Sequence, residues 1–151
     1  MNKGETYMEE LIRLENIEID IEATDWQDAI RKAGSLLEKA GSIKNAYIEN
    51  MIESVKTLGP YIVLMPGFAL GHSEPCPEVI KSDLSLITLK NPVDFGSIND
   101  PVKVVMCLAC TDKQSHMEGI QKVAMKLMQD NAIENMLSCG SKEELYKFIN
   151  E

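Results

Sequence analysis

The stretch V-K-V-V-M-C-L-A, Val102 to Ala109, decides the fold of this chain. Its only charged residue is Lys103, and it is rich in valine, a residue that favours strands. An apolar run without polar alternation is typical of a strand that is buried on both faces. We therefore predict that 102–109 is the central strand of a sheet and that helices cover both faces of that sheet.

Residue patterns on either side of the central strand predict the other elements. Ile17–Ile21 alternates apolar and acidic side chains, as a half-buried strand does. Thr24 and Gln27 form a capping box that begins a helix, and Gly41 lies where that helix should end. The remaining predicted elements are a helix at 44–58, strands at 61–65, 68–70 and 84–89, an extended edge piece at 92–95, and helices at 115–129, 131–137 and 141–148.

Helices before and after a run of strands predict the α/β class. We expect a single three-layer domain over residues 1–151, in which helices flank a central mixed β-sheet. The hydrophobic fraction of 44% is sufficient for the core of such a domain.

The net charge of −9 restricts the classes of partner. Nucleic acids and anionic membrane surfaces both require clustered Lys and Arg, so neither is an expected partner. An acidic surface would steer the protein towards a basic partner, or serve only to keep it in solution. Arginine occurs only as Arg13 and Arg31, so other donors would have to bind any phosphate.

The location predicted from the sequence is the cytoplasm. The N-terminus, from Met1 to Glu15, has no apolar signal-peptide region. The longest uncharged run, Thr57 to Ser73, is interrupted by proline and glycine and cannot be a membrane-spanning helix. With no export signal, we expect the four cysteines to be reduced thiols.

The two histidines are the candidate chemical groups. His72 follows a short predicted strand in F-A-L-G-H-S-E-P, where Gly71 allows close backbone approach or an unusual dihedral. His116 follows the central strand in T-D-K-Q-S-H-M-E, where Ser115 and Glu118 form a capping box that would place it in the first turn of a helix. The plain alternatives are an incidental loop histidine and an ordinary helix residue.

Taken together, the two positions indicate phosphate chemistry. Both histidines stand where a strand gives way to the next element, and sites in open α/β sheets form at the carboxyl ends of strands. An imidazole is nucleophilic near neutral pH, and a second imidazole can donate a hydrogen bond to a phosphoryl group on the first. The N–H groups of a helix N-terminus would also favour phosphate. No metal or cofactor is required if the phosphate arrives activated on another protein.

Cysteine chemistry is the competing interpretation. Cys107 and Cys110 form a C-x-x-C motif within an apolar run, where cysteine acts as a small hydrophobic residue and not as a thioredoxin-like thiol. A zinc site made of His72, Cys76, Cys110 and His116 has suitable ligand types but no diagnostic spacing. The chain contains no G-x-G-x-x-G motif and no Walker loop.

Three segments resemble one known family along nearly the whole chain. They are Y-I-E-N-M-I-E-S-V-K-T-L-G-P-Y-I-V-L-M-P-G-F-A-L-G-H (Tyr47–His72), L-K-N-P-V-D-F-G (Leu89–Gly96) followed by N-D-P-V (Asn99–Val102), and D-K-Q-S-H-M-E (Asp112–Glu118). In order and spacing they are similar to enzyme IIA of the phosphotransferase system, mannitol–fructose class, and look closest to its ascorbate-type branch.

The resemblance implies a function and a set of partners. His72 would accept a phosphoryl group from the phosphocarrier protein HPr and pass it to a cysteine of a cognate IIB domain, and a membrane IIC component would take up the sugar. His116 would stabilise the phosphohistidine. We expect Ser73 and Ser115 to help bind the phosphate. The sugar candidates are an ascorbate-like sugar and a pentitol, and the resemblance implies no metal, no cofactor and no membrane insertion of this chain.

The chain departs from the family pattern around His72. Gly71 and Ser73 stand where the family usually has proline and alanine, and Glu74 stands where the ascorbate-type branch commonly has arginine. Ser54 occupies the position at which the mannitol type has an arginine. Like charge near a phosphoryl group is unfavourable. Three explanations remain open: Glu74 points away, phosphorylation is weaker, or the partner supplies a cation.

Two other functions are compatible with the sequence. One is a regulatory module of the same fold, whose phosphorylation state controls a partner without feeding a transporter. The other is a metal-binding protein, based on the histidines and cysteines above.

Overall fold

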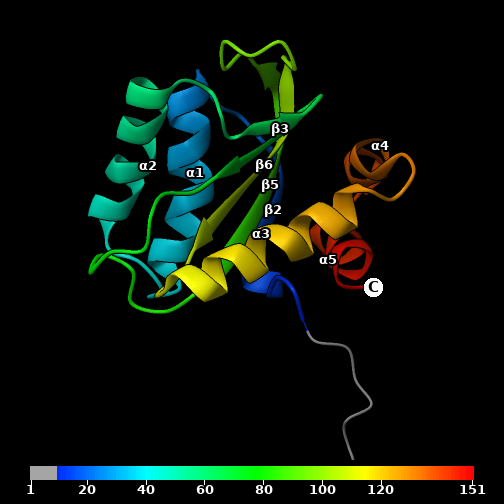
Figure 1. Cartoon of the computed structure of the whole chain (residues 1–151). Helices are drawn as coiled ribbons and strands as arrows, with labels where there is room; N and C mark the ends of the chain where they lie inside the picture. The colour runs from blue at the N-terminus through cyan, green and yellow to red at the C-terminus, as the bar shows by residue number, and fades with distance from the viewer. Residues whose placement is uncertain (1–9) are drawn as a thin grey trace, which may run out of the picture.

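The structure is a computed structural model, and it describes residues 10–151. Its strands form one five-stranded mixed sheet in the order β2-β5-β6-β4-β3 (Figure 1). The strands are β2 (Ile17–Ile21), β3 (Val63–Met65), β4 (Phe68–Gly71), β5 (Asp83–Val93) and β6 (Val102–Ala109). The apolar stretch 102–109 is therefore the middle strand, as predicted from its sequence.

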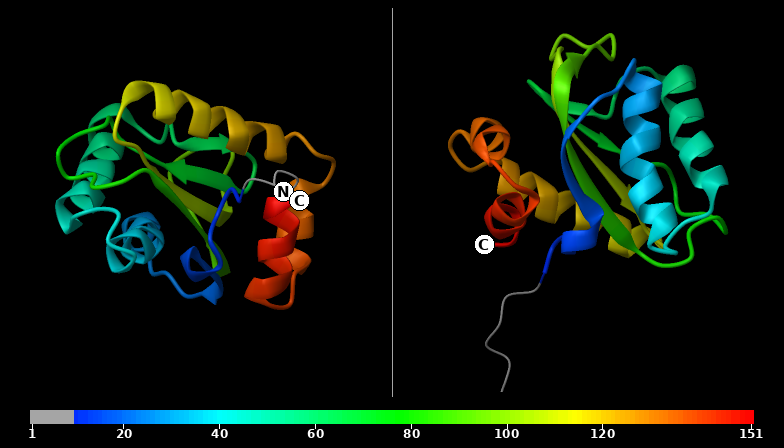
Figure 2. Two further views of the ribbon diagram at one scale, coloured as in Figure 1. Left: turned by 90° about the horizontal axis from the view of Figure 1, so that it is seen from below. Right: turned by 180° about the vertical axis from the view of Figure 1, so that it is seen from behind.

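Helices cover both faces of this sheet, which confirms the predicted α/β class and its three layers. Figures 1 and 2 show helices packed on each face of the sheet. The first face carries α1 (Trp26–Lys39) and α2 (Asn45–Leu58), and the second carries α3 (Lys113–Leu127), α4 (Ala132–Ser138) and α5 (Lys142–Asn150), while a short 3-10 helix η1 (Leu14–Asn16) precedes β2.

Alternate side chains of β6 enter two separate hydrophobic cores. Val105 and Cys107 belong to the core under α1 and α2. Val104 and Met106 belong to the core under α3, α4 and α5. All four are fully buried, which explains why this strand has no polar alternation.

The strand directions place the ends of two strands at one edge of the sheet. β4 runs parallel to β6, and their pairing extends from Phe68 opposite Val104 to Gly71 opposite Cys107. β5 runs antiparallel to β6, so that Asp83 at its start pairs with the end of β6. The residues that follow β4 and β6 therefore emerge together, beside the start of β5.

Some predicted boundaries are wrong. α1 begins one residue later than predicted, because the Asp25 carboxylate accepts the N–H of Asp28 and forms the N-cap in place of Thr24. The predicted edge piece 92–95 is not separate, since β5 extends into it as far as Val93. The end of α1 agrees with the prediction: Gly41 has a φ of +79° directly after the C-cap Ala40.

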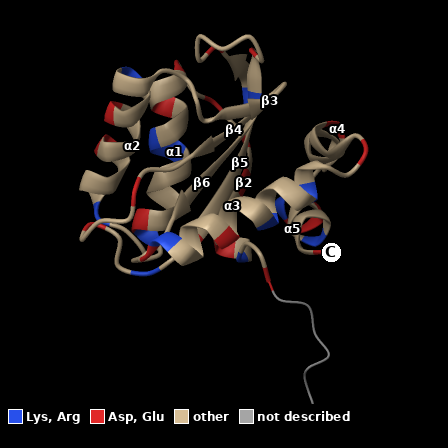
Figure 3. Ribbon diagram, viewed as in Figure 1, with Lys and Arg blue, Asp and Glu red and all other residues tan. Residues whose placement is uncertain are grey.

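Charged side chains lie mainly on the helices and loops, with both signs interspersed (Figure 3). Within the part of the chain that the structure describes, no helix has the length and apolar character required to cross a membrane.

Candidate active site

His72 is the first residue after β4 and is half-buried. Its Nδ1 lies 2.8 Å from the carbonyl oxygen of Leu70. A carbonyl oxygen only accepts hydrogen bonds, so Nδ1 must carry the proton when this bond is made. The tautomer that results leaves the lone pair of the neutral ring on Nε2. The backbone of β4 thus selects Nε2 as the nucleophilic nitrogen of His72.

His116 lies on α3, but this helix begins earlier than predicted. Asp112 is the N-cap, and its carboxylate accepts the N–H of Ser115 at 2.7 Å. The predicted capping box at Ser115 and Glu118 is therefore wrong, because the chain enters the helix three residues before it. The N–H of His116 already bonds to the carbonyl of Asp112. The Asp112 carboxylate also occupies the helix N-terminus that the sequence pattern assigned to phosphate.

The structure brings the two histidines together. The centroids of their rings are 5.3 Å apart, and the ring planes make an angle of 53°. The Tyr61 ring packs edge-on against His72, also at 5.3 Å, and its hydroxyl donates to the carbonyl of His72 at 3.2 Å. Sequence reasoning missed Tyr61, whose only signal was its place in a predicted strand.

The surroundings favour neutral imidazoles at both positions. Burial lowers the pKa of His72, and the neighbouring His116 lowers it further. Burial also lowers the pKa of His116, while the Glu74 carboxylate partly opposes this. A neutral His72 has the free lone pair that a nucleophile requires. The Nδ1 atom of His116 is buried, and no hydrogen bond to it is formed by any residue in the described range.

The side chains that depart from the family pattern lie next to this pair. The Ser54 and Ser73 hydroxyl oxygens are 3.4 Å apart, so α2 contributes a hydroxyl close to His72. Glu74 is exposed, but its charge affects both His116 and Tyr61, which shows that it remains near the site.

Neither arginine lies at the site to supply the positive charge that the family pattern has there. Arg13 donates to the Asp83 carboxylate at 2.7 Å, and Arg31 forms an ion pair with Glu49. Both arginines are thus engaged with carboxylates and not with the histidine pair.

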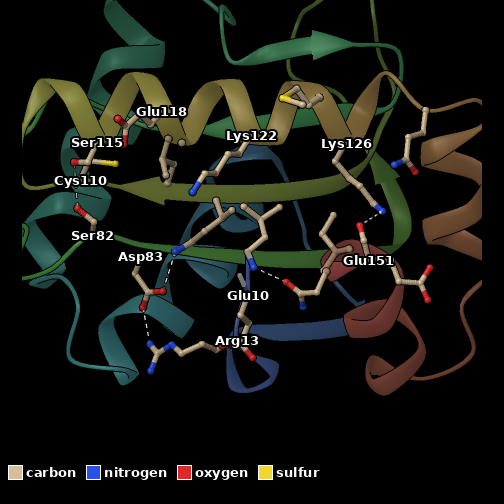
Figure 4. A pocket seen from close by; sticks show the side chains of 18 residues that line it. Glu10, Arg13, Ser82, Asp83, Cys110, Ser115, Glu118, Lys122, Lys126 and Glu151 are labelled. Atoms are coloured by element: carbon tan, nitrogen blue, oxygen red, sulfur yellow. Dashed lines mark hydrogen bonds and ion pairs between the residues drawn. The ribbon is translucent and has the colours of Figure 1, made fainter. Parts of the chain in front are cut away.

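The Ser115 hydroxyl makes its hydrogen bonds away from the histidine pair. It lies 3.4 Å from that of Ser82 and 3.2 Å from the carbonyl of Asp112. Ser115 lines one end of a pocket of about 720 Å³ between α3, β5, residues 10–13 and the C-terminal residues (Figure 4). At the other end of this pocket Lys126 donates to the backbone of Glu151 at 3.4 Å. The contacts of Ser115 thus give no direct link to His72.

The cysteines of the C-x-x-C motif are buried, as the apolar interpretation predicted. Cys107 belongs to the core under α1 and α2, and Cys110 to the core on the opposite face. Burial raises the pKa of Cys107 to about 12, so its thiol stays protonated. Among residues 10–151, no cluster of three or more His, Cys, Asp or Glu side chains is arranged to hold a metal ion.

Similarity to known proteins identifies the family of this chain. Residues 10–151 match the family described as phosphoenolpyruvate-dependent sugar phosphotransferase system, EIIA 2. The chain belongs to this EIIA family. The resemblance stated from the sequence is therefore confirmed, and the chain is a sugar-specific phosphoryl carrier of the phosphotransferase system.

Individual relatives support the same assignment. The ascorbate-specific PTS system EIIA component of Escherichia coli (strain K12) is 31% identical over 137 residues, which cover 89% of each protein. The mannitol-specific cryptic phosphotransferase enzyme IIA of Escherichia coli is 29% identical with a TM-score of 0.85, covering 94% of this EIIA chain and 99% of that one.

The structure of a third relative includes a partner protein. It is the Escherichia coli enzyme IIA for mannitol, solved in complex with phosphorylated enzyme IIB. It is 26% identical to this EIIA chain with a TM-score of 0.80, covering 91% of this chain and 96% of that one. These structures confirm the predicted mannitol-type enzyme IIA fold.

Proposed function

We propose that this EIIA chain accepts a phosphoryl group from phospho-HPr on Nε2 of His72 and passes it to a cysteine of a cognate IIB component. The observation that carries the proposal is the bond from His72 Nδ1 to the Leu70 carbonyl, which leaves Nε2 as the nucleophile. The chain would act in the cytoplasm, and a membrane IIC component would complete sugar uptake. An ascorbate-like sugar is the leading candidate, because a relative bears that specificity in its name.

Acceptance of the phosphoryl group by His72 would be a displacement at phosphorus. The lone pair on Nε2 of His72 forms a bond to phosphorus, while the bond between phosphorus and the donor atom of HPr breaks and leaves its electron pair on that donor. The His72 ring becomes cationic as it gives up its lone pair. The Leu70 carbonyl then accepts a charge-assisted hydrogen bond from Nδ1–H, which stabilises this cation. Transfer to a IIB thiolate is the same displacement with sulfur as the attacking atom.

Three neighbours would bind the phosphoryl oxygens. His116 is the nearest imidazole, and its buried Nδ1 has no partner among the described residues, so this ring has a hydrogen-bonding position in reserve. The hydroxyls of Ser73 and Ser54 lie close together beside His72 and can donate in the same way. Donors fixed in place before the reaction stabilise charge without reorganisation, and phosphoryl transfer depends mainly on such positioning and electrostatic stabilisation.

Ser115 was predicted to bind phosphate as well, and this stays a prediction. Its hydroxyl is engaged with Ser82 and with the start of α3. A Ser115→Ala variant that is phosphorylated at the wild-type rate would remove Ser115 from the phosphate-binding group.

The proposal is tested by phosphorylation with purified components. The chain is incubated with phosphoenolpyruvate, enzyme I and HPr, and acid-labile label is expected on the wild type and absent from His72→Ala. In His116→Ala, which keeps the proposed nucleophile, label is expected to appear more slowly but not to be absent. Label that persists in His72→Ala would contradict the assignment. Transfer onward is measured with a purified cognate IIB component.

A further inference from the structure

A buried tyrosine hydroxyl joins the segment that follows β4 to the end of β6, the two strands that precede the histidines. Tyr47 is in the first turn of α2 and its side chain has no solvent exposure. Its hydroxyl oxygen accepts the backbone N–H of Ser73 at 3.0 Å and lies 2.9 Å from the carbonyl of Leu108. The carbonyl of Ser73 is 3.2 Å away on the same side.

The partners of this hydroxyl are backbone groups of two segments, one directly after β4 and one near the end of β6. The pairing of β4 with β6 ends at Gly71 opposite Cys107. Ser73 and Leu108 follow shortly after these two residues, and Tyr47 bonds to both. The tyrosine hydroxyl thus joins the two segments just beyond the point where the pairing of β4 with β6 ends.

The Tyr47 hydroxyl can accept from one of these backbone groups and donate to the other. A phenol has one proton to donate and two lone pairs to accept with. It accepts from Ser73 N–H and donates to Leu108, its nearer carbonyl. Burial raises the pKa of Tyr47, so the hydroxyl keeps its proton and its donor role. Without the hydroxyl, the N–H and the carbonyl that it joins would both lose a buried partner.

The bridge reaches each histidine through adjacent residues. On one side Ser73 directly follows His72 in the chain. On the other side Leu108 packs against α3: a Cβ at Gly119 would lie 3.0 Å from its side chain, so the helix rests on Leu108 at this point. Gly119 is three residues after His116, which is about one helical turn.

We propose that Tyr47 is a positioning residue for phosphoryl transfer, whose hydroxyl sets the separation between the His72 segment and α3 and hence the relation of the two imidazoles. This inference rests on the proposed function of His72. The residue is fully buried, so it acts through Ser73 and Leu108. A displacement of about 1 Å at a transfer site is sufficient to slow a reaction by about 100-fold.

The test compares two tyrosine-to-phenylalanine variants. Tyr47→Phe removes one oxygen atom and keeps the buried ring. Tyr146→Phe is the matched control, because the Tyr146 hydroxyl bonds to Glu10 on the other side of the sheet. Phosphorylation by phospho-HPr is measured as kcat and KM at a temperature at which circular dichroism shows each variant folded. We expect kcat to fall between about 10- and 100-fold in Tyr47→Phe with KM unchanged, and both to stay at wild-type values in Tyr146→Phe.

Magnetic resonance separates positioning from a general loss of structure. In Tyr47→Phe the ring signals and pH titration of His72 and His116 are expected to shift, and in Tyr146→Phe they are expected to match the wild type. A Tyr47→Phe protein with a kcat within twofold of the wild type and unchanged histidine titrations would overturn the inference. If the wild type itself takes no label, the proposed function fails, and the histidine titrations still test the bridge.

A measurement on the unaltered protein covers the case in which Tyr47→Phe does not fold. The bridge predicts that the Ser73 amide hydrogen exchanges slowly, because its acceptor is a fully buried hydroxyl. The amide of exposed Glu74, the next residue, is the internal reference. Exchange of both amides at the same rate would overturn the inference.

Discussion

The rings of His72 and His116, which follow two parallel strands, lie with their centroids 5.3 Å apart at one edge of the sheet. This relationship follows from topology, since the chain leaves β4 at His72 and leaves β6 into α3. At this separation the charge of one imidazole affects the other, and His116 lowers the pKa of His72. The two imidazoles therefore influence each other, and they differ in their hydrogen-bond partners.

The first prediction concerns His116 as the stabiliser of phosphohistidine. His116→Ala should slow phosphorylation of His72 by about 100- to 1,000-fold, because it removes a fixed donor to the phosphoryl oxygens. The rate is measured in a single turnover with phospho-HPr. His116→Gln is the control, since its amide N–H can replace part of the imidazole's donor role, and it should lose less than alanine does. Equal rates for wild type and His116→Ala would exclude the role.

The second prediction concerns pH. The proposed nucleophile is the neutral His72 ring, and its pKa is lowered from the ordinary value of 6.5 by burial. The acceptance rate should therefore fall as the pH drops through this lowered pKa, with a midpoint below pH 6.5. Because His116 contributes to the lowering, His116→Gln should move this fall to higher pH. The profile is checked against a magnetic resonance titration of His72, and a wild-type midpoint at or above pH 6.5 would contradict the prediction.

The third prediction concerns Glu74, whose negative charge raises the pKa of His116. Glu74→Gln should therefore lower the pKa of His116, as measured by titration of its ring signals. The same change should increase the fraction of His72 that is phosphorylated at equilibrium, because a negative charge near the phosphoryl group is removed. Glu143→Gln, on the distant helix α5, is the control and should change neither quantity. An unchanged His116 titration in Glu74→Gln would show that the carboxylate acts elsewhere.

The strands were predicted well wherever burial alone determines the pattern. The bounds of β2 and β6 agree with the predicted 17–21 and 102–109, because one strand alternates and the other is apolar throughout. Helix starts were harder to predict. Asp112 and Ser115 are both good N-cap residues within one turn, and the path of the chain from β6 decides between them.

The pairing of the two histidines was also predictable, because strand ends in an α/β sheet gather at common edges. The role of Tyr47 was not. Its place on an apolar helix face accounts for its burial, and its hydroxyl partners lie 26 and 61 residues away in the sequence. Contacts of such separation leave no local pattern. Gly71 is a second feature that the local sequence could not decide. Its sequence position was compatible with either an unusual dihedral or a close approach of the backbone to a neighbour, and the structure shows the close approach.

The last prediction tests this close approach beside His72. A Cβ at Gly71 would lie 3.2 Å from the Cys107 sulfur, and Cys107 is fully buried and has little room to move. Gly71→Ala should therefore lower the free energy of unfolding by about 1–2 kcal/mol through overpacking. In a Cys107→Ala background the sulfur is absent, and the same glycine substitution should be neutral or slightly stabilising, since alanine restricts the unfolded chain more than glycine does. Urea unfolding of the four proteins gives the coupling energy, expected at about 1 kcal/mol or more. A coupling energy of zero would mean that the cysteine is not what requires glycine before His72.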